Sequence, residues 1–230
     1  MSVDRRVASN YDRHSLHSQD MRVINKMRHS PIHFSLFFIA LQLIFGCTRP
    51  DWFVGISGKY NEAYMEFLRG RAGNMDKAIL NLENIAQENP TYRDSLTLLG
   101  RAYYKKGRYQ DAHLILQRAF AVNKDDEIAW LAFGMTQLRL GDNERGLESI
   151  KGGLTLLSKT MKDGYRGFSG WDQNATVRSS LNRSALQALK GLDERENLIQ
   201  QTELLLVRID EEEWAQRRGK SIDRSIEVGN

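Results

Sequence analysis

Hydrophobic positions follow two different patterns along this chain. Residues 34–45 (FSLFFIALQLIF) form an uncharged apolar run that ends just before Gly46 and Cys47. From about residue 59, apolar residues instead recur every three or four positions, with polar residues between them. That spacing is typical of amphipathic α-helices. The pattern therefore separates a leading segment from a helical body.

The helical body repeats itself every 34 residues. Gly73, Gly107 and Gly141 are spaced by this period, and a small residue follows each of them five positions later. Glycine ends helices in many folds, but three glycines at one period favour a structural repeat. Each repeat reads as a helix, a glycine turn and a second helix. The units that the period predicts are 59–92, 93–126 and 127–160.

The middle unit carries the residues that suggest a family. It has small residues in both helices and apolar residues at helical spacing, namely Leu96, Leu99, Gly100, Tyr103, Gly107, Tyr109, Ala112, Leu116 and Ala119. This set resembles the tetratricopeptide repeat, although Glu66 stands in the first unit where a small residue is usual. The resemblance implies an all-α fold, a right-handed superhelical stack of antiparallel helix pairs over residues 59–160.

Two further helices are predicted after the repeats. Residues 161–174 break the helical pattern with glycines and aromatic residues, which indicates an ordered loop. Helices are then expected over 175–189 and from 193 to about 218, the second with Glu211, Glu212 and Glu213 facing water. We interpret residues 175–219 as a divergent C-terminal capping helix pair, because the last repeat of a stack needs a cover. Residues 220–230 are predicted to be a disordered tail.

The leading segment resembles a bacterial lipoprotein signal peptide. Twelve helical residues span only about 18 Å of a hydrocarbon core that is about 30 Å thick, so residues 34–45 suit a signal peptide better than a membrane span. Residues 44–47 (IFGC) resemble the lipoprotein box, except that Phe45 replaces a small residue. The resemblance implies lipidation and a new N-terminus at Cys47. An uncleaved signal anchor or a buried free cysteine is the alternative.

This interpretation divides the N-terminal part at Cys47. Residues 1–46 are an N-terminal extension and signal peptide, with the true start at Met21 or Met27, and residues 47–58 are a tether. Thr48 follows the cysteine where aspartate would retain a lipoprotein in the inner membrane. By resemblance to enterobacterial sorting, we expect the outer membrane, with the protein facing the periplasm.

Composition excludes several functions. The chain has 33 Lys and Arg against 29 Asp and Glu, a net charge of +4, and residues 1–33 account for +3 of it. The nearly neutral body lacks the basic face that nucleic acids need. His113 is the only histidine after residue 33 and Cys47 the only cysteine, so we expect no disulfide, no metal and no cofactor.

No catalytic motif stands out in the sequence. It contains no glycine-rich phosphate loop, nucleophile motif or HExxH pattern, and no small-molecule substrate is evident. We therefore expect a non-catalytic scaffold that binds a protein or peptide partner. The alternative is a periplasmic enzyme or accessory subunit with a site in the 161–174 loop, around Asp163, Tyr165 and Asp172.

The family resemblance also suggests where a partner would bind. In such repeats the first helix of each unit lines a concave groove, and an apolar floor with flanking cations suits a peptide with apolar anchors and some acidic character. Arg101 is expected to be exposed there. In the alternative, the C-terminal helices fill the groove. The predicted groove residues are Phe67, Arg71, Thr97, Arg101, Tyr104, Lys105, Leu131, Met135, Leu138 and Arg139.

Overall fold

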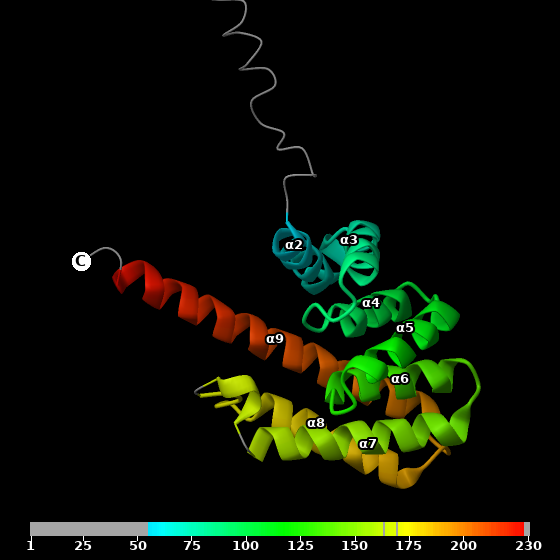
Figure 1. Cartoon of the computed structure of the whole chain (residues 1–230). Helices are drawn as coiled ribbons and strands as arrows, with labels where there is room; N and C mark the ends of the chain where they lie inside the picture. The colour runs from blue at the N-terminus through cyan, green and yellow to red at the C-terminus, as the bar shows by residue number, and fades with distance from the viewer. Residues whose placement is uncertain (1–54, 163, 169, 228–230) are drawn as a thin grey trace, which may run out of the picture. The chain divides into compact units, whose positions relative to one another are not determined.

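The computed structural model describes residues 55–162, 164–168 and 170–227, and within these ranges the fold is entirely helical. Three consecutive helix pairs come first (Figure 1). Their helices are α2 (Ile56–Leu68), α3 (Met75–Glu88), α4 (Ser95–Lys105), α5 (Tyr109–Val122), α6 (Glu127–Arg139) and α7 (Asn143–Lys162). The predicted all-α stack of helix pairs is therefore confirmed.

The turn glycines serve the repeats in two ways. Gly107 and Gly141 have φ values of +73° and +88°, in the left-handed region that side chains with a Cβ rarely adopt. Gly73 is extended, but an added Cβ would lie 2.0 Å from the carbonyl oxygen of Glu66. The first turn therefore requires glycine for close backbone approach, and the other two require it for backbone conformation.

Small residues inside the helices allow the pairs to pack closely. A Cβ added to Gly134 of α6 would lie 2.7 Å from the carbonyl oxygen of Gly146 in α7, and one added to Gly100 would lie 2.5 Å from Leu116 Cγ. Ala112, in α5, is completely buried. Larger side chains at these positions would force the helices apart.

The chain after the repeats forms a loop and two helices. A short 3₁₀ helix, η4 (Tyr165–Gly167), leads to α8 (Thr176–Lys190) and α9 (Arg195–Glu227). α9 packs along α8 and crosses between α8 on one side and α2 and α4 on the other (Figure 1). Within the described ranges, no helix combines the length and apolar composition that spanning a membrane requires.

The end of α9 differs from the sequence prediction. The helix continues to Glu227, whereas a disordered tail was expected from residue 220. No proline occurs after residue 90, so no residue blocks the helical backbone there. The expectation that Glu213 faces water is also wrong, because that side chain is 5% exposed and accepts a hydrogen bond from the Tyr64 hydroxyl at 3.2 Å.

Candidate functional site

The concave face of the stack is lined by α2, α4 and α6, where most of the predicted groove residues lie. Seven of the ten are buried, namely Phe67, Thr97, Arg101, Tyr104, Leu131, Met135 and Leu138. Arg139 is half-buried, whereas Lys105 and Arg71 are exposed, the latter in the turn helix η3 (Gly70–Ala72). The structure thus answers an alternative that the sequence left open: α9 covers much of this face.

Two of the predicted groove residues belong to the interior of the third repeat instead. A Cβ added to Gly153 would lie 2.9 Å from Leu131 Cδ2, and one added to Gly146 would lie 2.8 Å from Leu138 Cδ2. Both glycines are in α7. Leu131 and Leu138 therefore pack against the second helix of their own repeat, and their assignment to the groove is corrected.

Arg101 forms the central contact between the concave face and α9. Its Nη1 and Nη2 donate to the two Asp210 carboxylate oxygens at 2.9 and 2.6 Å. Both side chains are close to nine-tenths buried. Burial alone would lower the pKa of Arg101, but the Asp210 carboxylate reverses this and raises the pKa above its ordinary value. The expectation that Arg101 is exposed is wrong, because it faces a helix of its own chain.

Two more polar contacts extend this interface toward the third repeat. Tyr104 donates its hydroxyl hydrogen to Glu203 at 2.5 Å, and Arg139 donates to both carboxylate oxygens of Glu196 at 2.8 and 3.0 Å. Burial and the neighbouring Glu203 raise the pKa of Tyr104 above its ordinary value, so the hydroxyl remains a donor. The acidic residues of α9 therefore meet the concave face at regular intervals.

The Phe67 ring of α2 contacts two cations of α4, Arg101 and Lys105. The guanidinium carbon of Arg101 lies 4.8 Å from the centre of the Phe67 ring, and Lys105 Nζ lies 3.7 Å from it. Although part of the Lys105 side chain is exposed, desolvation of its ammonium group beside the Phe67 ring and the neighbouring Arg101 lower the pKa of Lys105 to about 8. Thr97 instead donates to Asp126 at 2.6 Å, linking α4 to the first turn of α6.

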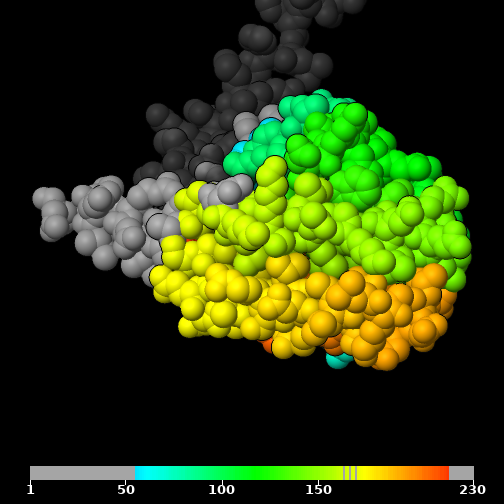
Figure 2. Space-filling view, turned by 90° about the horizontal axis from the view of Figure 1, so that it is seen from below, coloured from blue at the N-terminus to red at the C-terminus, as the bar shows by residue number. Residues whose placement is uncertain are grey.

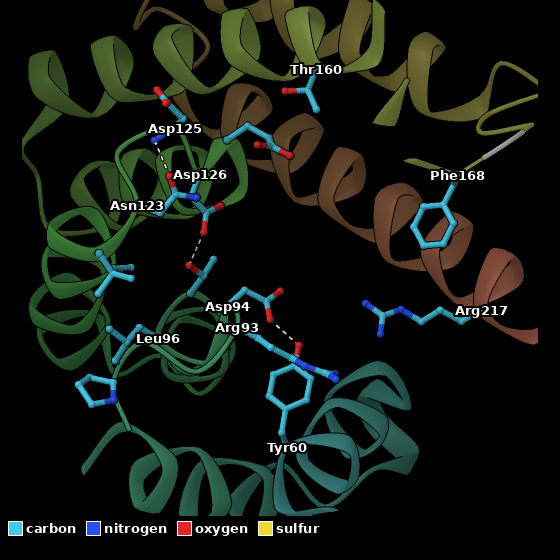
Figure 3. Close-up of a pocket in the computed structure, with 15 residues that line it drawn as sticks. Tyr60, Arg93, Asp94, Leu96, Asn123, Asp125, Asp126, Thr160, Phe168 and Arg217 are labelled. Carbon is cyan, nitrogen blue, oxygen red and sulfur yellow. Dashed lines mark hydrogen bonds between the residues drawn. The ribbon is translucent and has the colours of Figure 1, made fainter. Parts of the chain in front are cut away.

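One part of the concave face remains open beside α9. This cleft has a volume of about 840 Å³. Figure 3 shows Tyr60 and Asp94 on one side of it and Phe168 and Arg217 on the other. Tyr60 donates its hydroxyl hydrogen to Asp94, and burial together with that carboxylate raises the pKa of Tyr60. The Arg93 guanidinium carbon lies 5.1 Å from the centre of the Tyr60 ring. The cleft is large enough for a bound segment. However, polar side chains that line it form hydrogen bonds with each other, such as Tyr60 with Asp94 and Thr97 with Asp126.

The loop proposed for an enzyme site has a structural role. Tyr165 is fully buried and stacks on Trp171 with ring centres 4.1 Å apart. Asp172, 2% exposed, accepts hydrogen bonds from the backbone N–H groups of Val177 and Arg178 at 2.8 and 2.9 Å. It therefore caps the start of α8. The third residue of that hypothesis, Asp163, lies outside the described residues.

The lipidation site and the metal site are two further points on which the sequence analysis made a prediction. Cys47, the predicted lipidation site, lies outside the described residues, as do residues 1–54. In the part of the chain that is described, no three His, Cys, Asp or Glu side chains gather as a metal site would require.

The comparison with protein families agrees with the helix pairs. Residues 71–145, from η3 to the first turn of α7, match the family model described as Tetratricopeptide repeat. Within these residues the chain carries tetratricopeptide repeats. No curated protein matches the chain.

The residues that sequence reasoning missed are the acidic partners on α9. Glu196, Glu203 and Asp210 are seven positions apart, so they share one helical face. The seven-residue spacing of these acidic residues, together with the cations of the predicted groove, was the sequence signal that could have indicated their pairing. The acidic, amphipathic ligand expected in the groove is a helix of the same chain.

Proposed function

We propose that this protein is a non-catalytic scaffold that binds another protein and is held at a membrane by a lipid on Cys47. The observation that carries the binding function is the array of tetratricopeptide repeats, whose family serves protein–protein interaction. The capping role of Asp172 also favours a scaffold over the enzyme alternative.

The membrane part of the proposal rests on the sequence of the leading segment. An apolar run too short to span a bilayer ends at the chain's single cysteine. A lipidated cysteine carries several acyl chains, and more than one anchoring signal gives stable attachment. Such a protein would work in the bacterial cell envelope, at the outer membrane facing the periplasm.

The decisive experiment for binding uses the full chain with a C-terminal tag, produced at its natural level. One partner should co-purify in a constant ratio and should recover this protein when it is tagged in turn. If the purified protein is alone and catalyses a turnover that Asp172→Asn abolishes, the enzyme alternative is correct.

Anchoring is tested separately with Cys47→Ser. We expect loss of lipid labelling and accumulation of the unprocessed precursor, because no other thiol can accept the lipid. A Cys47→Ser protein that matures at the native size and fractionates with the outer membrane as before would contradict lipidation.

A further inference from the structure

A second groove lies between α7 and α8, where it is separate from the face that α9 covers. It encloses about 450 Å³. Leu154, Leu181 and Ala185 contribute its apolar part, and Lys159 and Lys162 line it from α7. Figure 2 views the molecule from the side on which α7 and α8 form the surface.

Two exposed leucines extend this groove along α8. Leu186 is 60% exposed and Leu189 is 79% exposed, the highest value among the large apolar side chains in the described ranges. They follow Asn182, which lines the groove, at helical spacings of four and seven residues, so all three share one side of α8. The groove and these two leucines are together called the α7–α8 strip.

The charges beside the α7–α8 strip are mainly positive. Lys151, Lys159 and Lys162 project from α7, and Arg178 is one turn before Asn182 on α8. Among the described residues, none of these four side chains has an ion pair or a hydrogen bond. The cations Arg101 and Arg139 of the concave face, by contrast, each bind a carboxylate of α9.

Within α7 itself, the acidic residues lie at the other end of the helix. Glu144 and Glu148 lie in its first two turns, away from Lys159 and Lys162. The end of the strip that contains the groove is therefore cationic and apolar. A ligand that complements it needs apolar side chains in a row and carboxylates beside them.

We propose that the α7–α8 strip binds an acidic amphipathic helix of the partner protein. The inference rests on the proposed protein-binding function and names where the partner docks, since α9 occupies the concave face. One row of apolar side chains would lie along the groove and against Leu186 and Leu189, with carboxylates beside Lys159 and Lys162. α9 binds the concave face of this chain with the same combination of apolar and acidic residues.

Two other occupants fit less well. A second copy would bring the same excess of positive charge to the interface, which opposes association. A membrane surface is complemented by a broad apolar face that can be immersed. Of the leucines in this strip only Leu186 and Leu189 are exposed, whereas Leu154 and Leu181 are more than nine-tenths buried within the groove.

Photo-cross-linking of the full chain in the cells that produce it tests the site. p-Benzoylphenylalanine is placed at Leu189, which is 79% exposed, with the exposed position Leu114 on α5, 60% exposed, as the control. We expect an adduct at Leu189 whose cross-linked segment is an acidic amphipathic helix from another protein. A second copy, a lipid, a basic segment, or no adduct above the Leu114 control would overturn the proposal.

A synthetic peptide of the captured segment then measures the contribution of charge. Lys159→Glu combined with Lys162→Glu should weaken its binding on the order of tenfold or more and reduce the salt dependence. The control pair Lys106→Glu with Lys124→Glu, also exposed, should bind as the native protein does. Equal losses in both pairs would contradict a specific site.

These results separate the inference from the proposed function. If the partner still co-purifies with a Leu189→Glu, Lys159→Glu, Lys162→Glu variant of native melting temperature, the α7–α8 strip is not the docking site, although the scaffold function stands. If no partner co-purifies with the native chain, the scaffold function itself fails.

Discussion

Arg101 and Asp210 are 109 positions apart in the chain, yet they form a bidentate ion pair that joins the second repeat to the last helix. The pair is buried, so each charge depends on the other for compensation. Removing one partner leaves an isolated charge in a water-excluded environment. This costs far more free energy than breaking an ion pair on the surface.

We therefore expect Asp210→Ala to lower the free energy of unfolding by about 3–5 kcal/mol. Chemical denaturation followed by circular dichroism measures this. The double variant Arg101→Met with Asp210→Leu should recover much of the loss, because neither charge remains. A loss below about 1 kcal/mol, the range of exposed pairs, would show that α9 does not hold Arg101 in solution.

Met135→Glu distinguishes an open groove from a covered one. Met135 is 2% exposed, so a carboxylate there would be buried without a partner and should strongly lower the melting temperature and helical content. Met135→Leu, which conserves volume, should cost less than about 1.5 kcal/mol. A Met135→Glu protein that melts like the native one would contradict the burial of this residue.

Ala112 tests the repeat register. The residue is fully buried, so Ala112→Leu should cost about 1–3 kcal/mol through overpacking. Leu114→Ala, two positions away at an exposed site, should change stability by less than about 0.5 kcal/mol. Similar melting shifts for the two variants would argue against the register derived from the glycines.

Asp172 tests whether the loop is structural. Asp172→Ala removes the acceptor for two backbone N–H groups of α8 and places alanine at a φ of +52°, so we expect a loss of about 1–2 kcal/mol. Asp172→Asn keeps an acceptor and tolerates that backbone, and it should lose less. Thermal melts compare the two, and equal melting temperatures for all three proteins would contradict the cap.

Lys105 should titrate near pH 8. Burial and Arg101 lower its pKa from 10.5 to about 8, whereas the acidic neighbours Asp210 and Glu203 act in the opposite direction. The pH dependence of amine acetylation, read by mass spectrometry, should have its midpoint there. An acetylation midpoint near the ordinary value of 10.5 would contradict the lowered pKa of Lys105.

The same shift predicts a pH dependence of stability. Between about pH 8 and pH 10.5 the unfolded chain binds the Lys105 proton and the folded chain does not, so this residue makes stability rise with pH in that window. Lys105→Met should remove this contribution from denaturation curves taken across the window.

The sequence predicted the repeats well because their determinants are local. The spacing of Gly73, Gly107 and Gly141 reflects turn chemistry and close helix approach, which can be recognised without knowing the fold. The path of α9 could not be predicted in this way. Glu203 and Asp210 resemble solvent-facing charges until Tyr104 and Arg101 are placed opposite them, and that placement depends on tertiary packing.

The groove prediction failed in part for a related reason. Helical spacing alone does not say whether Leu131 and Leu138 face the concave surface or α7, because both surfaces are apolar. Gly146 and Gly153 decide the matter by opening space on α7. Side-chain volume on the neighbouring helix, more than hydrophobicity on α6, determines which residues remain available for a partner.

The course of α9 changes how this solenoid should unfold. Repeat stacks ordinarily behave as one-dimensional chains in which each unit interacts only with its neighbours and the ends can fray independently. Here Glu213 bonds Tyr64 of the first repeat, and Glu196 bonds Arg139 of the third. One helix thus connects the two ends of the array, so the repeats should melt together as a single cooperative unit.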